Sequence, residues 1–509
     1  MSVETLKSTL PRDALASVVV FLVALPLCMG IAIASGLPPA KGLVTGIVGG
    51  LVVGFLAGAP LQVSGPAAGL TVLVFELVQQ YGAAMLGPIL LLAGAIQLLA
   101  GRLRLGCWFR VTAPAVVYGM LAGIGVLIVL SQLHVMLDAS PQASGLDNLQ
   151  AFPAALREAL PLIGAGDGFA AGLLGLLTIG LMALWDRFRP GRLRLLPGAL
   201  LGVAAATLVG LWMGLDVRRV EVPANLGEAI DWLRPGDLLN LAEPGVLIAA
   251  LAVAFIASAE TLLSAAAVDR MHQGPRADFD RELSAQGVGN MLCGLLGALP
   301  MTGVIVRSSA NVQAGARTRL SAMLHAVWLL ASVVLLAGLL EQIPVAALAA
   351  VLVYTGIKLV DIKALRYLGR YGRMAMFIYA ATALAIVSTD LLTGVLIGFA
   401  LTLAQLAWRA SRLKINLIQE EGSHHAELRM IGAATFLKVP QLAKALELVQ
   451  PDCHLHVPLD RLSYIDHACM ELLDEWQRAH RASGARLIIE QHALKRRLEG
   501  RRRRLALGA

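Results

Sequence analysis

The sequence predicts a polytopic α-helical membrane protein with about fourteen membrane-crossing segments, followed by a small α/β domain. Three observations predict this class. Hydrophobic residues make up 57% of the 509 residues and charged residues only 15%, whereas soluble globular proteins carry about 25% charged residues. Apolar stretches of about 20 residues, the length of a spanning helix, recur from Ala16 to Arg409. After Trp408 they give way to alternating strand-like and helical patterns.

The first apolar run is too long for the core of a signal peptide, so we expect it to span the membrane. The fifty-one glycines fit a helical bundle in lipid, where small residues allow close helix approach. These segments form a predicted transmembrane domain, residues 1–411. The expected spans or half-spans are 16–36, 41–58, 66–80, 83–101, 112–136, 168–185, 195–215, 246–268, 283–299, 303–315, 320–340, 345–361, 372–388 and 391–409.

Basic residues collect in every second loop. They follow the fourth, sixth, eighth, tenth and twelfth segments, whereas the intervening loops carry few, such as Lys41 and Arg157. By the positive-inside rule, both termini are predicted to be cytoplasmic, in a bacterial inner membrane. The net charge of +8 comes from these loops and from a terminal tail, so it does not indicate a nucleic-acid partner. Five scattered cysteines without metal-ligand spacing favour reduced thiols over a metal site or disulfides.

Two segments are too short or too broken to span alone. One is residues 66–82, entered through Ser64-Gly65-Pro66, and the other is 302–316, entered through Leu299-Pro300. They are the third and tenth segments, which hold equivalent places in two halves of seven. Paired interrupted helices in matching positions indicate an inverted-repeat transporter with a binding site near the membrane midplane. The alternative is two Gly/Pro-containing helices that pack tightly.

If the two broken helices meet end to end, their N-termini point at one place near the bilayer centre. Unpaired amides and the positive end of the helix dipole favour an anion there. Arg307, one turn into the tenth segment, adds a fixed positive charge; a structural ion pair or an interfacial charge is the alternative. The residues predicted to hold the anion at the two helix starts are Ala67, Ala68, Gly69, Gly303, Val304 and Ile305.

Glu260 lies inside an apolar run, residues 246–268, and is its only charge. A carboxylate in hydrocarbon is costly, so such residues usually face a polar cavity and mark an ion or proton path. Ser264 follows one helical turn later, on the same face. With backbone carbonyls near Gly303 and Ile305, these oxygens predict a Na⁺ site, or an H⁺ site if Glu260 is protonated. A hydrogen bond by a protonated, purely structural glutamate is the alternative.

Three blocks of the chain resemble the sulfate permease (SulP) family of anion transporters. They are LVALPLCMGIAIASGLPPAKGLVTGIVGGLVVGFLAGAPLQVSGPAAGLTVLV (22–74), GALPMTGVIVRSSANVQAGARTRLSAMLHAVW (297–328) and the α/β tail, which resembles a STAS domain. The resemblance implies a 7+7 inverted repeat with core and gate domains, elevator-like alternating access and a homodimer. The block 302–328 looks closest to members associated with carbonic anhydrase, which implies bicarbonate as substrate and a functional link to that enzyme.

The resemblance also assigns roles to residues. It implies an anion site at the two helix starts, with Arg307 at the family's arginine position and the first helix lining the site near Pro26, Leu27 and Cys28. Glu260 and Ser264 match the cation-binding acidic residue and hydroxyl of bicarbonate members. This chain departs from them in having Glu in place of Asp, which leaves Na⁺ coupling open. Hydroxyl residues of some relatives are replaced here by Ala67 and Ile305, so backbone groups must select the substrate.

The predicted STAS domain, residues 412–497, has strand-like stretches at 425–432, 454–459 and 485–491, with helical patterns at 439–449 and 467–484. His467 stands where anti-sigma antagonists carry a phosphorylatable Ser, so we expect a docking or dimerising role instead of a phosphoswitch. The basic tail, residues 498–509 with Lys495 to Arg497 before it, suits the anionic lipid of the inner leaflet or is simply a solvated end.

Together these features predict a secondary transporter that imports a small inorganic oxyanion, most plausibly bicarbonate, coupled to Na⁺ or H⁺. Sulfate, a C4-dicarboxylate and an uncoupled anion channel are the alternatives. We do not expect an enzyme, because the sequence has no nucleophile-elbow, HExxH or P-loop pattern. No cofactor is expected besides the coupling ion.

Overall fold

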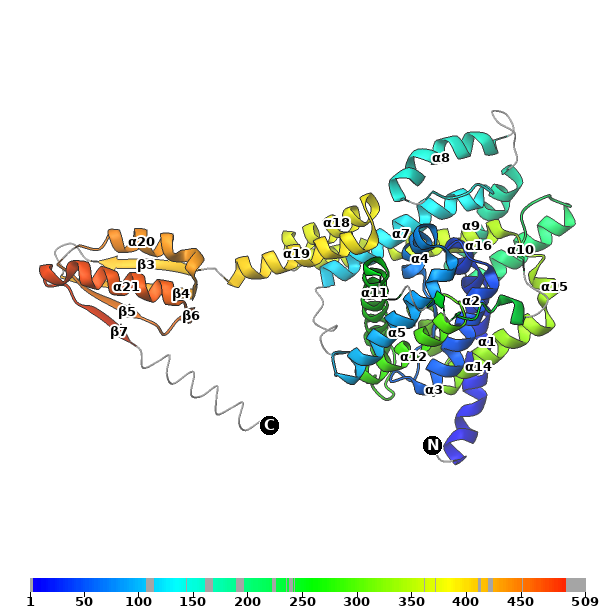
Figure 1. The fold of residues 1–509 in the computed structure, drawn as a ribbon, viewed down its shortest axis with the longest axis horizontal. Coiled ribbons are helices and arrows are strands. Elements are labelled where there is room, and N and C mark those ends of the chain that lie inside the picture. The colour runs from blue at the N-terminus through cyan, green and yellow to red at the C-terminus, as the bar shows by residue number, and fades with distance from the viewer. Residues whose placement is uncertain are drawn as a thin grey trace. The chain divides into compact units, whose positions relative to one another are not determined.

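The computed structural model describes residues 3–490, apart from 107–113, 143, 161–167, 189–195, 222–225, 235, 238–240, 242, 361, 371, 411–412, 420–423 and 451. The predicted basic tail therefore lies outside the described residues. The chain forms two compact units, Met1–Phe399 and Ala400–Ala509 (Figure 1). Each is described by itself below.

All fourteen predicted segments have a counterpart among the described elements. Within the described residues, eight helices are long and apolar enough to cross a membrane by themselves. The first seven segments correspond to α1 (Val3–Ala34); α2 (Pro39–Val48), η1 (Gly49–Val53) and α3 (Gly54–Leu56); β1 (Ser64–Pro66), η2 (Ala68–Leu70) and α4 (Thr71–Tyr81); η3 (Ala83–Met85) and α5 (Leu86–Arg102); α7 (Pro114–Met136); α9 (Phe169–Phe188); and α10 (Gly198–Trp212). The second seven correspond to α11 (Pro244–Asp269); α12 (Phe279–Leu295); β2 (Met301–Gly303) and α13 (Ile305–Gln313); α14 (Leu320–Leu335) and α15 (Ala337–Leu340); α16 (Val345–Leu359); α18 (Arg373–Ser388); and α19 (Leu391–Ala410).

Among the described α-helices of the membrane unit, two have no counterpart in the predicted segments. They are α8 (Gly145–Ala159) and α17 (Ile362–Gly369), which connect spans and have mixed polar and apolar sequences. Ser144 caps α8 by accepting a hydrogen bond from the Asp147 amide at 3.1 Å. Lys41 also differs from expectation. It lies in α2 rather than in an exposed loop, and its buried ammonium donates to Asp231 Oδ2 and to the Gly297 carbonyl, both at 2.6 Å.

The membrane helices pack in two groups that correspond to the expected core and gate domains. In the core group α5 packs on α12 and α11, and α1 packs on α2, α13 and α14. In the gate group α7 packs on α16 and α18, and α9 packs on α10 and α16. Because α7 and α16 are the fifth and twelfth segments, this contact joins equivalent members of the two halves.

Glycines make the tightest contact of the core group possible. A Cβ on Gly94 of α5 would stand 2.5 Å from the Gly287 carbonyl of α12, and a Cβ on Gly287 would stand 2.6 Å from the Gly94 carbonyl. Two helix turns away, Gly87 and Gly294 face each other in the same way. Small residues therefore let the backbones of α5 and α12 touch. In lipid, where the hydrophobic effect does not drive helices together, such close packing stabilises their association.

The C-terminal unit is an α/β domain. Its strands are β3 (Leu413–Gln419), β4 (His425–Ala434), β5 (His454–Pro458), β6 (Leu462–Ile465) and β7 (Leu487–Glu490), in the order β3-β4-β5-β7 with β6 also pairing with β4. The β3–β4 pair is antiparallel and the others are parallel. Helices α20 (Val439–Glu447) and α21 (His467–His480), with η7 (Phe436–Lys438) and η8 (Arg481–Ser483), complete the unit.

Alternating side chains build the core of this unit. Leu428 and Met430 of β4 and Leu455 of β5 pack with Leu442 of α20 and Leu473 of α21, as expected when one face of a sheet is covered by helices. The strands and helices predicted between 425 and 491 are all present, whereas β3 and β6 lie outside the predicted stretches. The arrangement fits the STAS domain that the sequence resemblance implies.

Candidate anion and cation sites

The two broken segments meet through a short antiparallel pair of strands. In it Ser64 of β1 faces Gly303 of β2, and Pro66 faces Met301. Each strand leads directly into a half-helix, β1 into η2 and α4, and β2 into α13. Because paired strands lie about 5 Å apart, the starts of the two half-helices are held close together. The sequence predicted this meeting of helix starts but not the strands that produce it.

Neither half-helix start is capped by a side chain. Ala67 precedes η2 and Val304 precedes α13, both with extended backbones and without a side-chain cap. The first amides of a helix have no partner within the helix, so this arrangement suits an anion. Ala67 and Gly69 are buried, whereas Ala68 is half-buried.

At the tenth segment the available amides differ from those predicted. The Gly303 amide donates to Thr261 Oγ1 at 3.1 Å, and the Val304 amide donates to the Val63 carbonyl at 2.9 Å. The amides without an acceptor in the helix are therefore those of Ile305 and the two residues after it. Ile305 is 38% exposed and is the first residue of α13, so its backbone amide is one of these.

Arg307 is fully buried beside the strand pair. Its Nη1 lies 2.3 Å from the point where a Cβ on Gly65 would stand, and its Nη2 donates to the Pro66 carbonyl at 3.4 Å. Its Nε and Nη1 have no hydrogen-bond partner, and no carboxylate forms an ion pair with it among the described residues. A buried guanidinium without a counter-ion is costly, and it offers unused donors to an anion.

Glu260 of α11 turns toward the start of the other half-helix. Both its carboxylate oxygens lie 2.8 Å from the point where a Cβ on Gly69 would stand, and Oε2 is buried without a hydrogen-bond partner. The structure thus places this carboxylate inside the protein and next to η2. Ser264 is buried one turn further along α11. No ion pair joins Glu260 to Arg307 in the part of the chain that the structure describes.

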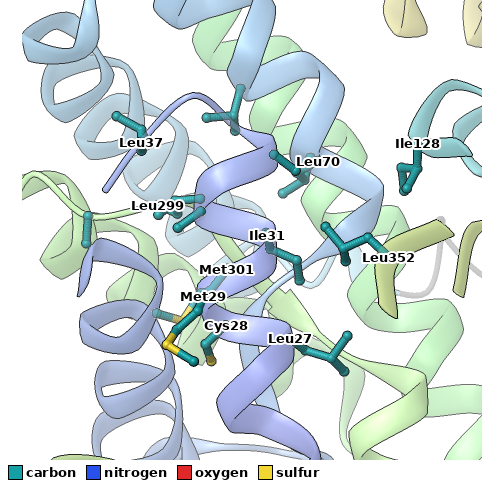
Figure 2. Packing of buried hydrophobic residues seen from close by; sticks show 14 of the residues in the cluster. Leu27, Cys28, Met29, Ile31, Leu37, Leu70, Ile128, Leu299, Met301 and Leu352 are labelled. Atoms are coloured by element: carbon teal, nitrogen blue, oxygen red, sulfur yellow. The ribbon is translucent and has the colours of Figure 1, made fainter. Parts of the chain in front are cut away.

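Leu27 and Cys28, which the family resemblance placed at the anion site, are buried in the middle of α1. Figure 2 shows that their side chains leave α1 in different directions: Cys28 lies with Met29 and Met301, whereas Leu27 lies toward Leu352. The Cys28 sulfur lies 2.9 Å from a Cβ position on Gly46, and the Cα of Gly46 lies 3.7 Å from the Cβ position on Gly65 that Arg307 adjoins. Of these two residues, Cys28 is therefore the one that lies near the predicted anion site.

Several polar residues that support the site were missed by the sequence analysis. Gln62 donates from Nε2 to the Thr261 carbonyl at 3.1 Å, and this nitrogen lies only 1.3 Å from a Cβ position on Gly303. Asn290 bonds to both backbone groups of Met301 in β2. Its Oδ1 accepts from the Met301 amide at 2.8 Å, and its Nδ2 donates to the Met301 carbonyl at 3.2 Å. Gln97 accepts from Asn290 at 2.7 Å. Gln97 is an isolated polar residue in an apolar segment, which is the signal that identified Glu260. Asn290 has Gln286 one turn before it, and Gln62 lies between two predicted segments.

Comparison with known proteins decides the family. The profile of the sulfate permease family matches residues 10–382. The chain belongs to this family. Members and relatives are transporters, not enzymes, so this sulfate permease family protein is a multi-pass membrane anion transporter. The polytopic fold and the family assignment predicted from the sequence are thereby confirmed.

Relatives of this family member carry names of two kinds. YvdB of Bacillus subtilis, which bears a provisional name as a sulfate transporter, is 30% identical over 396 residues, 77% of this chain and 72% of the relative. The bicarbonate transporter BicA of Synechocystis is 29% identical over 378 residues, 70% of this chain and 63% of BicA. Both names denote transport of a small inorganic anion.

Two solved structures are similar to this family member. The transmembrane domain of a cyanobacterial bicarbonate transporter BicA superposes with a TM-score of 0.64 and 26% identity, covering 76% of this chain and 97% of that domain. SLC26A9 gives a TM-score of 0.77 at 16% identity, over 95% of this chain and 84% of SLC26A9. The second likeness concerns the fold alone.

Proposed function

We propose that this protein is a secondary active transporter that imports a small inorganic oxyanion, with bicarbonate favoured, by elevator-type alternating access coupled to Na⁺ or H⁺. The observation that carries the proposal is the buried Arg307, which has unused donors and lies beside two uncapped helix starts that a strand pair holds together. Such donors stabilise a charged oxyanion without water.

The coupling ion is assigned to Glu260. Its carboxylate has an unpartnered oxygen and lies against the start of the half-helix that also faces the anion. A cation bound there, or a proton, would neutralise the carboxylate while the anion is bound nearby, which couples the two bindings. Ser264 and the carbonyls near Gly303 and Ile305 are the further oxygens assigned to Na⁺. Glu260 and Ser264 offer only hard oxygen ligands, which suit Na⁺ better than a transition metal.

Sulfate is the second candidate, because a relative with 30% identity has a sulfate-transporter name. We also propose that the protein is a homodimer in the bacterial inner membrane, with both termini cytoplasmic and its basic tail near anionic lipid, and that it works beside a carbonic anhydrase. A C4-dicarboxylate transporter and an uncoupled channel remain the other outcomes of the transport test.

Proteoliposomes with the purified protein test the proposal. Uptake of labelled bicarbonate, labelled sulfate and a labelled C4-dicarboxylate is measured with and without an inward Na⁺ gradient, and with and without an inward H⁺ gradient. We expect concentrative bicarbonate uptake that one of the gradients drives and that Arg307→Gln abolishes. Sulfate accumulation alone would establish the second candidate. Ohmic anion current without accumulation would establish a channel and contradict the proposal.

A further inference from the structure

His325 is a fully buried imidazole in α14 that the proposed transport mechanism does not use. Its Nδ1 bonds to the carbonyl of Ala322, one turn earlier in the same helix. A carbonyl oxygen only accepts, so Nδ1 carries the hydrogen and the neutral ring has its lone pair on Nε2. This Nε2 is buried and has no hydrogen-bond partner.

The His325 imidazole of α14 and the Arg307 guanidinium of α13 lie beside consecutive turns of the second segment, which α2 and η1 form. His325 Cε1 stands 2.7 Å from a Cβ position on Gly50. Arg307 Nη1 stands 2.3 Å from a Cβ position on Gly65, and that same position is 3.7 Å from the Cα of Gly46. Gly46 and Gly50 are four residues apart, so they share one helix face. The two side chains also interact electrostatically.

The second segment has a wider helical turn beside these two side chains. Gly49–Val53 forms a π-helical turn, η1, and a Cβ on Gly49 would stand 2.5 Å from the Ser64 carbonyl of β1. Single π-helical turns inside α-helices occur frequently at functional sites. This one brings the backbone of the second segment against both β1 and His325.

We propose that His325 is a proton-binding partner of the anion site, so that a proton on its Nε2 and an anion on Arg307 stabilise each other. Without an anion, a second positive charge beside Arg307 is unfavourable, and the ring stays neutral. An anion between the two groups reverses this preference, because the protonated Nε2 becomes a second cationic donor. The proton comes from solution with the anion. This inference rests on the proposed function, since it concerns the same anion site.

The charged and titratable groups around His325 allow this role. Arg307 of α13 supplies the neighbouring positive charge, and the turn of η1 that His325 contacts contributes Gly50. From α1, the Cys28 sulfur lies 2.9 Å from a Cβ position on Gly46. Asp13, also on α1, bonds to residues that precede α14. Its carboxylate accepts from the Arg317 amide and from the Thr318 hydroxyl, both at 2.7 Å.

The test compares the full-length protein with His325→Asn, His325→Gln and Glu260→Gln. Asn retains a donor for the Ala322 carbonyl and removes Nε2, whereas Gln places an uncharged amide near the Nε2 position. Labelled sulfate and labelled bicarbonate exchange is measured in proteoliposomes without any ion gradient, from acidic to alkaline pH, with bicarbonate corrected for its CO₂ equilibrium.

We expect the apparent KM of wild type and Glu260→Gln to fall with falling pH, by up to about tenfold per pH unit for one linked proton. In both His325 variants the KM stays near its alkaline value at every pH. An unchanged pH slope in His325→Asn overturns the inference and leaves the proposed function standing. Absence of exchange by wild type overturns both.

A second measurement covers the case in which the His325 variants do not fold. The increase in melting temperature caused by sulfate or bicarbonate is recorded for wild type and Glu260→Gln across the same pH range. A stabilisation that grows as the pH falls in both proteins supports the inference. A stabilisation independent of pH overturns it.

Discussion

The carboxylate of Glu260 lies against the Cα of Gly69, with both oxygens 2.8 Å from the point where a Cβ would stand. The contact joins α11 to the start of the first half-helix, so any side chain at position 69 must displace the carboxylate. Glycine here is therefore required by the approach of a charged group and not by backbone conformation. The negative charge also lies at the positive end of a helix dipole.

Gly69→Ala should impair coupling while leaving the fold intact. The added methyl overlaps the Glu260 oxygens, and overpacking of this kind costs about 1–3 kcal/mol. The displaced carboxylate then binds its cation less well. Gradient-driven uptake in proteoliposomes measures the loss. Gly180→Ala in α9 is the matched control, because a Cβ there would meet nothing within 4 Å; equal activity of the two variants would contradict the prediction.

Glu260→Gln should uncouple transport. The amide keeps the size of the side chain but removes the negative charge that would hold the cation, and typical coupling free energies correspond to factors of about 5–150. We expect accumulation driven by the cation gradient to fall by a factor in this range, with anion exchange retained. Size-exclusion elution identical to wild type serves as the control for folding. Wild-type accumulation in this variant would remove Glu260 from the mechanism.

Asn290→Leu should destabilise the membrane domain through β2. The substitution leaves both the amide and the carbonyl of Met301 without the partners that now lie at 2.8 and 3.2 Å. Each unsatisfied buried group costs about 1–3 kcal/mol, so the melting temperature in detergent should drop clearly. Thr355→Val is the control, since its hydroxyl donates to Val351 within the same helix. A smaller drop for Asn290→Leu than for the control would refute the role of Asn290.

Cys469 in the C-terminal unit should react slowly with maleimide in the native protein. Burial, and secondarily the Asp466 carboxylate, raise the pKa of its thiol, and only the thiolate is nucleophilic. At neutral pH the native thiol is therefore less ionised than a free cysteine, and its reactivity should recover only at more alkaline pH. Peptide mass spectrometry of native and urea-unfolded protein compares the labelling rates. Equal rates at neutral pH would show that the thiol is accessible.

Sequence reasoning succeeded where the signal is local and repeated. Long apolar runs predicted most of the segments because hydrocarbon requires about 20 apolar residues per crossing, and the third and tenth segments stood out because they are shorter or interrupted. Glu260 and Arg307 stood out as charges in uncharged segments, and the structure buries polar atoms of both. The short helices α8 and α17 were missed because their mixed composition resembles that of ordinary loops.

What escaped prediction depends on contacts between distant parts of the chain. The strands β1 and β2 are three residues each and are separated by more than 200 residues, so no local sequence pattern predicts their pairing. The same holds for the amides of Gly303 and Val304, whose partners Thr261 and Val63 belong to other elements. Gln97 could have been found as an isolated polar residue in an apolar segment, but its partner Asn290 could not.

The antiparallel pair of β1 and β2 has a mechanical consequence. The ladder ties a residue next to each half-helix to its counterpart in the other repeat, so sliding one helix along the membrane normal would require breaking backbone bonds in a medium that offers no replacement. The starts of the two half-helices therefore form one unit, to which both halves of the repeat contribute. Any movement that exposes it to the opposite side of the membrane must transport both helix starts together, as a single piece, past the remaining helices.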